Sequence, residues 1–299
     1  MELTEDQQKT AEIEVKRYLP RSQQVYGYLM LKNRVRSDPV KILVDRWPQF
    51  NVIVCKPQWE ERGDHFKDMI IFAKDGAALE EIIRKSSVID WTQNNCFGTS
   101  LPHMEIIKAL AAEKNVPIEK LAVCHMMILE DIHHLPSIER YKAHSDVLII
   151  NNSFRRHSQT FSLFRISSGI SLSSLDESHV ALVNQMWKFG KDEEAVRMIR
   201  NMVTNFPSCC VLGADGQPVS WMLTYASCAM GMLYTLPEHR GKGYAKVLIS
   251  CMAKRHHAQG YPVYCFVEEE NVVSYRLLKN MGFTEDPSYR ETWCRINQP

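Results

Sequence analysis

A turn rich in glycine and basic residues, Leu-Pro-Glu-His-Arg-Gly-Lys-Gly-Tyr-Ala, occupies residues 236–245. It lies between a short apolar run and a segment whose apolar residues recur every three or four positions, as on one face of a helix. The first amides of a helix have no partner inside it and lie at the positive end of its dipole. Gly241 and Gly243 let phosphate oxygens approach these amides closely, and Arg240 and Lys242 add positive charge. The sequence therefore predicts a pyrophosphate site, formed by Arg240, Gly241, Lys242, Gly243, Tyr244 and Ala245.

Two other nucleotide-binding turns do not fit this segment. The Gly-x-Gly-x-x-Gly pattern of a dinucleotide site does not occur in it, and neither does the spacing of a Walker P-loop. An ordinary strand-to-helix connection remains the alternative for the turn taken alone.

Length and composition indicate a globular protein of two domains. The chain has 299 residues, and domains commonly contain about 150. A content of 45% hydrophobic and 24% charged residues excludes a disordered or fibrous chain. Because 36 basic side chains are balanced by 35 acidic ones, no general field attracts nucleic acid, and any anion recognition must be local. Nucleic acid is therefore not an expected partner.

The cysteines, the histidines and the lengths of the apolar runs bear on the cellular compartment, on metal binding and on membrane association. Nine cysteines, an odd number without a Cys-x-x-Cys pair, predict reduced thiols in an intracellular compartment. His133-His134 and His256-His257 lack the spacing of a zinc site, so no metal is expected. No run reaches the roughly 18 to 20 apolar residues that cross a bilayer, so integral membrane association is not expected either.

Strand-like and helix-like runs alternate in the first half of the chain, which predicts a mixed α/β layer. The expected strands are 41–44, 50–54, 69–72, 121–129 and 146–150, and the expected helices are 76–85 and 104–113.

The polar, serine-rich stretch 151–174 is interpreted as a link between an N-terminal domain over 1–165 and a C-terminal domain over 170–299. Beyond this link, capping residues, glycines and alternating runs predict two helices, three strands, a helix, a strand, a helix and a strand. In chain order they cover 176–189, 192–205, 209–212, 219–223, 229–236, 244–259, 262–267, 272–281 and 291–296.

Motifs of a known family occur in order along both halves of the chain. They include Tyr26-Gly27, Val44-Asp45-Arg46-Trp47-Pro48, Trp187, Phe189-Gly190, Phe206-Pro207, Gly216-Gln217-Pro218-Val219-Ser220-Trp221 and Tyr234-Thr235-Leu236-Pro237-Glu238-His239-Arg240. With these motifs the chain resembles the glycine N-acyltransferase family of the GNAT superfamily, and the expected ααβββαβαβ order matches the GNAT fold. The resemblance implies an α/β fold with a mixed sheet, in which the N-terminal domain is also GNAT-like.

The resemblance implies transfer of an acyl group from acyl-CoA to the amine of glycine, giving N-acylglycine and CoA. Acyl-CoA is then a co-substrate, no permanently bound cofactor is needed, and the partner is glycine or another small amine. A monomer is expected. Family members imply a mitochondrial location, with the endoplasmic reticulum or the cytoplasm as alternatives.

The resemblance also assigns the CoA site residue by residue. The backbone of Leu233, Tyr234 and Leu236 would lie along the pantetheine arm, and the turn from Arg240 to Ala245 would hold the pyrophosphate. Asn271 and Ser274 would flank the arm from the following strand and helix.

The catalytic positions depart from the family pattern. Ala229 stands where the family has its glutamate base, and Leu278 stands where many GNAT enzymes have a tyrosine acid. Tyr275 lies one helical turn from Leu278 and is not assumed to replace that tyrosine. The general base is therefore unknown, with Glu238 as a weak candidate and His239, Tyr225 and Glu268-Glu269-Glu270 as others. Two further functions stay open, namely acyl transfer to a different amine and acyl-CoA binding without catalysis.

Overall fold

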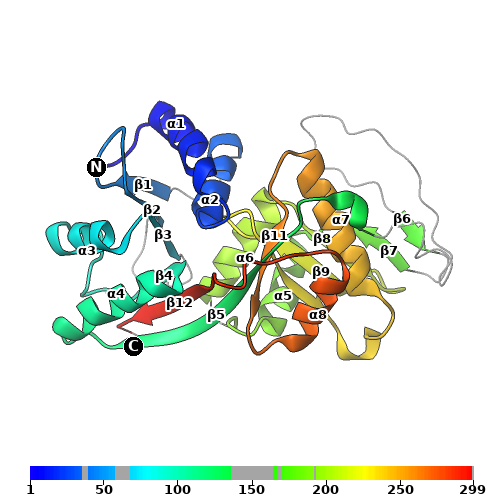
Figure 1. Cartoon of the computed structure of the whole chain (residues 1–299). Helices are drawn as coiled ribbons and strands as arrows, with labels where there is room; N and C mark the ends of the chain where they lie inside the picture. Colours follow the sequence, from blue (N-terminus) through cyan, green and yellow to red (C-terminus); the bar gives the residue numbers. More distant parts are fainter. Residues whose placement is uncertain (36–39, 58–67, 136–163, 167–169, 192, 298–299) are drawn as a thin grey trace.

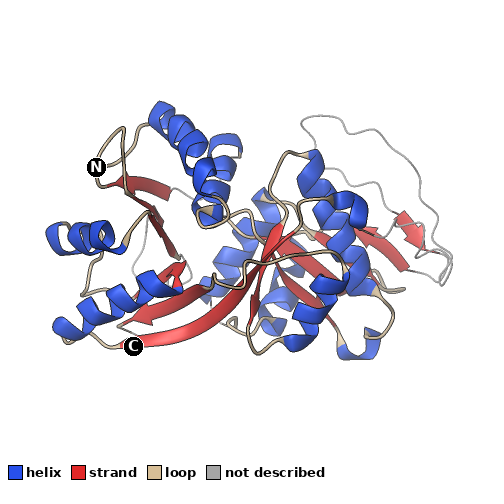
Figure 2. Ribbon diagram, viewed as in Figure 1, coloured by secondary structure: helices blue, strands red, loops and turns tan. Residues whose placement is uncertain are grey.

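A single twelve-stranded sheet runs through the molecule (Figure 1). The computed structural model describes residues 1–35, 40–57, 68–135, 164–166, 170–191 and 193–297. Within these residues the strand order is β1-β2-β3-β4-β12-β5-β11-β10-β9-β8-β7-β6, with helices on both sides of the sheet (Figure 2). We call β1 to β4 with β12 the N-half of the sheet, and the remaining strands the C-half.

Helices cover the N-half on both faces. Successive residues of its second strand belong to opposite hydrophobic clusters, because side chains alternate along a strand. Val52 and Val54 pack with α3 and α4, whereas Ile53 and Cys55 pack with α1 and α2. The elements are α1 (Glu5–Val15), α2 (Gln23–Arg34), β1 (Val40–Val44), β2 (Val52–Pro57), β3 (Met69–Ala73), α3 (Gly76–Lys85), β4 (Asn95–Ser100) and α4 (Leu101–Glu113).

The C-half has the same layered arrangement. Cys209 belongs to the cluster under α7, and Cys210 belongs to the cluster under α5 and α6. Both cysteines are fully buried, as is expected of a strand covered on both faces. The elements are β5 (Ile118–Ile128), β6 (Phe164–Ile166), β7 (Ile170–Ser173), α5 (Val180–Met186), α6 (Glu193–Asn205), β8 (Cys209–Leu212), β9 (Pro218–Thr224), β10 (Met230–Thr235), α7 (Tyr244–Ala258), β11 (Tyr264–Glu268) and α8 (Val272–Asn280). The last strand of the chain, β12 (Glu291–Ile296), belongs to the N-half.

The two halves exchange their last strands. The C-terminal strand β12 lies between β4 and β5, and the long strand β5 pairs with β12 on one edge and with β11 on the other. Each half is therefore completed by a strand from the other part of the chain. The strands of both halves belong to one sheet, and the division into domains over 1–165 and 170–299 stays a prediction.

Most of the expected C-terminal elements are confirmed, and β8 and β12 begin and end where they were expected. The helix expected over 176–189 is shorter, because Trp187 has extended backbone angles and α5 ends at Met186. Two strands, β6 and β7, lie within the stretch that was interpreted as a link. The first two helices and β4 had no sequence prediction. The strand expected over 146–150 and the helix start at Asp192 lie outside the described residues.

Each half contains one parallel pair of strands joined by a helix. In the N-half, β3 pairs with β4 through α3, and in the C-half, β10 pairs with β11 through α7. The register of β10 with β11 contains one residue pair, Met230 with Cys265. Beyond that pair the two strands separate, and this separation shapes the site described next.

Candidate active site

A cavity of about 530 Å³ lies where β10 and β11 separate. Its lining includes residues of β5, β10, β11 and α8, and also residues of α2, β4 and β12 from the N-half. A bulge interrupts the pairing of β10 with β9 between Gly231 and Tyr234, and Met232 within it has a φ of 50°. Bulges re-aim backbone groups at functional sites. Leu233 and Tyr234, both predicted to lie along the pantetheine arm, line the cavity.

Leu236 differs from Leu233 and Tyr234 in its hydrogen bonding and in its position relative to the cavity. Its amide donates to the carbonyl of Val219 at 3.0 Å, so this amide is part of the sheet. The structure does not place Leu236 in the lining of the cavity.

The glycine turn has the backbone that the sequence predicts for an anion site. Gly241 has a φ of 76° and Gly243 has a φ of 79°, both in the left-handed region that disfavours other residues. A Cβ at either position would meet no atom within 4 Å, so backbone conformation is what requires glycine there. Gly243 is the N-cap of α7 and supplies no side-chain cap. The main-chain amides of residues 241–245 have no partner among the described residues.

The basic side chains of this turn are exposed, whereas its aromatic side chain is buried. The Nε of Arg240 donates to the carbonyl of Thr235 at 3.1 Å, and its guanidinium lies 5.7 Å from the ring centre of Tyr234. Arg240 and Lys242 are exposed, with their charges outside the core. The ring of Tyr244 is buried in the core under α7, so only its amide faces the turn.

Asn271 and Ser274 lie at the start of α8 and line the cavity. The side-chain oxygen of Asn271 accepts a hydrogen bond from the Ser274 amide at 3.1 Å, which caps the helix. The Asn271 carbonyl oxygen is thus committed to the cap, whereas its amide nitrogen has no partner among the described residues. Both residues line the cavity, and their place beside the pantetheine arm stays a prediction.

The position of the absent glutamate lies in a tight turn at residues 225–229. Ala229 is buried and lines the cavity, and its carbonyl accepts from the Tyr225 amide at 2.9 Å. A Cβ at Gly27 would lie 1.9 Å from the Ser227 carbonyl oxygen, so α2 packs directly against this turn. The same carbonyl accepts a hydrogen bond from the hydroxyl of Tyr264.

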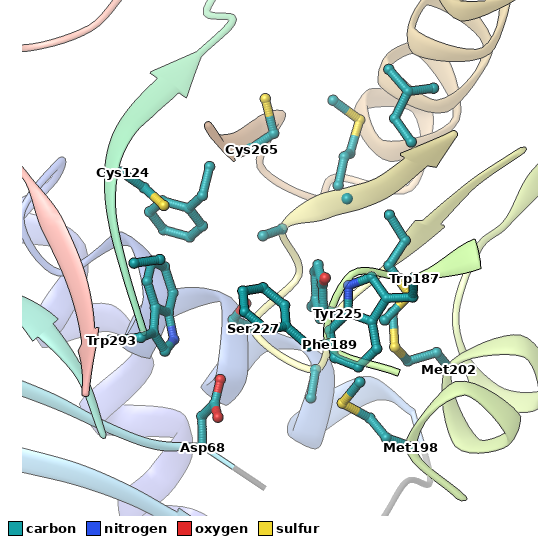
Figure 3. Close-up of a pocket in the computed structure, with 18 of the residues that line it drawn as sticks. Asp68, Cys124, Trp187, Phe189, Met198, Met202, Tyr225, Ser227, Cys265 and Trp293 are labelled. Carbon is teal, nitrogen blue, oxygen red and sulfur yellow. The ribbon is translucent and has the colours of Figure 1, made fainter. Parts of the chain in front are cut away.

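Tyr225 projects into the cavity from this turn (Figure 3). A Cβ at Gly231 would lie 2.3 Å from the Tyr225 ring, so that glycine makes room for the ring on β10. Burial raises the pKa of the Tyr225 hydroxyl well above its ordinary value, although a hydrogen bond with Trp187 acts in the opposite direction. The phenol therefore stays neutral at physiological pH and is a poor general base.

The other acid/base candidates from the sequence are mostly engaged or outside the cavity. Glu238 is exposed in a short 3₁₀ helix, Pro237–His239, and neither it nor His239 lines the cavity. The hydroxyl of Tyr275 donates to Glu285, so this tyrosine is held away from the position of Leu278.

Of Glu268, Glu269 and Glu270 at the end of β11, Glu268 alone lines the cavity, and Glu269 and Glu270 are exposed. Glu268 lines the cavity and forms an ion pair with Lys188. Glu269 pairs with Arg290 at 2.8 Å. Leu278, at the position of the family acid, is buried and lines the cavity without a titratable group.

One carboxylate that sequence reasoning missed points into the cavity. Asp68 directly precedes β3, and Figure 3 shows its carboxylate pointing into the space between Trp293 and Ser227. The available signal was an acidic residue at the start of a predicted strand, which sequence alone does not connect with the glycine turn. Asp68 is the acidic group that the N-half contributes to the cavity lining.

Comparison with solved structures defines the fold. A crystal structure of a Drosophila protein from a structural genomics consortium superposes with a TM-score of 0.75 at 17% identity, covering 99% of this chain and 98% of that one. A tandem GNAT protein from the clavulanic acid biosynthesis pathway superposes with a TM-score of 0.51 at 13% identity, covering 100% and 98%. The fold predicted from the sequence, an α/β GNAT fold with a mixed sheet, is therefore confirmed.

Sequence comparison then defines the family. The profile of aralkyl acyl-CoA:amino acid N-acyltransferases matches residues 2–207, and the profile of the C-terminal region of the same family matches residues 209–296. The chain is 31% identical to glycine N-acyltransferase of Rattus norvegicus over 293 residues, with 94% of each chain covered. It is 30% identical to glycine N-phenylacetyltransferase of Bos taurus, with 93% of each covered. The chain belongs to the aralkyl acyl-CoA:amino acid N-acyltransferase family and is an acyltransferase.

No helix in the described part of the chain is both long enough and apolar enough to span a bilayer.

Proposed function

We propose that this protein transfers an acyl group from acyl-CoA to the amino group of glycine, releasing CoA and N-acylglycine. The proposal rests on one observation, namely that the glycine turn directly follows a strand that lines the cavity. The uncapped turn with Gly241 and Gly243 follows β10, and β10 lines the cavity in which the strands separate. A thioester that lay along β10 with its pyrophosphate on the turn would present its acyl carbon inside this cavity.

The cavity favours an apolar acyl group. Aromatic and sulfur-containing side chains dominate the part near the 225–229 turn, where apolar lining is typical of sites for small hydrophobic groups. These side chains are Met186, Trp187, Phe189, Met198, Met202, Phe206 and Trp221. A volume of about 530 Å³ holds an aromatic or medium-length acyl chain together with the acceptor.

The second candidate is acyl transfer to an amine other than glycine. It is favoured by Ala229, which removes a negative charge and several atoms from the acceptor side of the cavity relative to the family pattern. An acceptor larger than glycine would fill the freed volume.

One experiment tests both candidates. The purified full-length protein is incubated with acetyl-CoA, benzoyl-CoA or a long-chain acyl-CoA and with a panel of amino acids and amines. Thiol release and mass spectrometry of the products then report turnover. We expect N-acylglycine from benzoyl-CoA. A different acylated amine as the main product would support the second candidate, and saturable acyl-CoA binding without thiol release with any acceptor would contradict both.

The setting of this activity follows the family resemblance. We place the protein in mitochondria and treat it as a monomer, with fractionation of cells and sedimentation of the purified protein as the measurements that check these two proposals.

A further inference from the structure

We infer that Asp68, on the N-half side of the cavity, is the general base that accepts the proton of the acceptor amine. This inference rests on the proposed function, since it names the group that performs a step of that reaction. It assigns to an aspartate in the N-half the role that the family gives to a glutamate at the position of Ala229.

The first argument is position. Asp68 and Ala229 both line one cavity, and the Asp68 carboxylate points into it. Asp68 and Tyr225 are close enough that the charge on the aspartate contributes to the raised pKa of the phenol. A base must lie within hydrogen-bond reach of the proton it takes, and an acceptor held in this cavity lies between the aspartate and β10.

The second argument is that the aspartate is held in place. Its carboxylate accepts hydrogen bonds from the indole N–H of Trp293 and from the thiol of Cys96. Trp293 lies across Gly98, where a Cβ would come within 2.9 Å of the indole nitrogen. The glycine on β4 therefore lets the indole of β12 reach the aspartate, and the exchanged strand supplies the donor.

The third argument is the proton affinity of the group. Burial raises the pKa of the Asp68 carboxyl to about 6, while the hydrogen bonds from Cys96 and Trp293 and the charge of Arg295 hold it lower than burial alone would. The charged and titratable groups that face it are Cys96 from β4, Arg295 from β12 and Tyr225 from the 225–229 turn. A carboxyl with this pKa is ionised at pH 7 and is a stronger base than an ordinary aspartate.

The fourth argument is that the competing carboxylates have other partners. Glu268 lines the cavity but pairs with Lys188. Glu291 is buried, but its two oxygens accept hydrogen bonds from Gln24 and Tyr289, and it does not line the cavity. Among the described residues, two carboxylates line the cavity, Asp68 and Glu268. Glu268 forms an ion pair with a lysine, whereas within these residues no ion pair with a cationic side chain is found for Asp68.

The proposed step balances in atoms and charge. Asp68 takes one proton from the ammonium group of the acceptor, which frees the nitrogen lone pair. That nitrogen bonds to the thioester carbonyl carbon, and the carbon–sulfur bond breaks. After the attack the nitrogen still carries one proton more than an amide holds, and this proton passes to the departing sulfur, so CoA leaves as the thiol. The amide keeps the acyl group and one N–H, and Asp68 returns its proton to solvent.

Substitution of Asp68 by asparagine tests the inference. We expect D68N to lower kcat about 100- to 10,000-fold, the usual contribution of a general base, with the thermal shift caused by acyl-CoA retained. The conservative variant D68E should recover a measurable part of the rate. The matched control is E291Q, which removes a buried carboxylate that does not line the cavity and should keep kcat within a few-fold of the wild type.

The pH profile gives a readout that a structural role would not change. For the wild type, kcat/KM for total amine should rise with pH up to about 6, where Asp68 ionises, and then level off. In D68N only the free amine reacts, so kcat/KM should rise about tenfold per pH unit through neutrality without a bend near 6. W293F removes a donor that favours the ionised carboxylate, so the bend should move to higher pH.

Three outcomes overturn the inference in different ways. If the wild type turns over and D68N retains both its kcat and the bend near pH 6, the base is another group and the proposed function stands. If the wild type binds acyl-CoA but acylates no acceptor, the proposed function fails, and the role of Asp68 fails with it. Loss of the acyl-CoA thermal shift in D68N together with normal kcat in D68E would mean that the carboxylate supports binding rather than proton transfer.

Discussion

Two strand-to-helix turns occupy corresponding places in the two halves of the sheet. In each half a strand leads through a turn into a helix and on to a parallel neighbour, as β3-α3-β4 and as β10-α7-β11. The turn before α3 ends in Asp75, whose carboxylate accepts a hydrogen bond from the Ala78 amide at 2.8 Å. The turn before α7 ends in Gly243, which has no side chain to cap the helix. The N-terminus of α3 is therefore capped by a carboxylate of the chain itself, whereas no described side chain caps the first amides of α7.

This difference shows that the fold by itself does not make a CoA site. Helix N-termini attract anions wherever they occur, and a capping aspartate satisfies that attraction from within the chain. In the C-half, Gly241 and Gly243 adopt left-handed angles, no described side chain caps α7, and Arg240 and Lys242 flank the open amides. We therefore expect CoA to bind at α7 and not at α3, and three substitutions test this expectation.

The largest effect is expected for Gly243→Val. A β-branched residue at a φ of 79° is strained, so the turn should change shape and move several amides away from the pyrophosphate. Affinity for CoA should fall by more than about 100-fold, because several charge-assisted hydrogen bonds are lost together. Calorimetric titration with CoA measures the loss.

The matched control for this variant is Gly216→Val. Gly216 has a φ of 77°, and a Cβ there would also meet no atom within 4 Å. It lies in the turn between β8 and β9 and belongs neither to the α7 turn nor to the cavity lining, so the substitution should introduce similar strain without loss of CoA binding. Equal binding by both variants would remove the α7 turn from the CoA site.

A smaller effect is expected for Arg240→Ala. The exposed guanidinium contributes a hydrogen bond to a charged group, for which about 1.5 kcal/mol is the lower end of the usual range. Affinity for CoA should therefore fall about tenfold, and the difference from the wild type should shrink at high salt because exposed charges are screened. Titrations at two ionic strengths measure this.

Arg84→Ala is the control for charge. Arg84 is an exposed arginine of α3 that pairs with Glu80 and Glu113, so its loss changes net charge by the same amount in the other half. It should leave CoA affinity unchanged. A similar loss in both variants would indicate that only the overall charge of the protein matters.

The smallest effect is expected for Asp75→Ala, and it should concern stability alone. Loss of an aspartate N-cap costs about 1 kcal/mol, which corresponds to a fall in Tm of a few degrees for a chain of this size. CoA affinity and stoichiometry should stay unchanged, because opening the α3 terminus adds no glycine turn and no basic side chain. A second equivalent of CoA bound to D75A would break the comparison, since it would mean that the cap alone separates the two turns.

Local signals predicted much of the C-half and of the CoA turn. Glycine and basic spacing predicted a turn at a helix start, and the structure has this turn before α7, with Gly241 and Gly243 in the left-handed region. Alternating runs and stop signals predicted the strands and helices from 209 onward. The first two helices had no sequence prediction, since their apolar residues do not form a clear stripe and their burial comes from the sheet that they cover.

No local sequence pattern predicted the residues on the acceptor side of the cavity. Asp68 and Trp293 meet because β12 inserts beside β4, and no spacing in the chain reports a contact between residues so far apart. The same holds for Gly98, which looks like an ordinary strand glycine until the indole is placed over it.

By itself the sequence determined the features that depend on neighbours along the chain. These are the glycine turn that opens the α7 terminus, the aspartate that closes the α3 terminus and the order of strands and helices in the C-half, because backbone angles, caps and periodicity are set within a few residues. The tertiary structure alone decided which edges of the sheet pair. That choice exchanges β5 and β12 between the halves and brings a carboxylate of the N-half to the cavity beside β10. The physical reason is that a strand edge offers the same amides and carbonyls to any partner, so burial of the whole sheet selects the pairing.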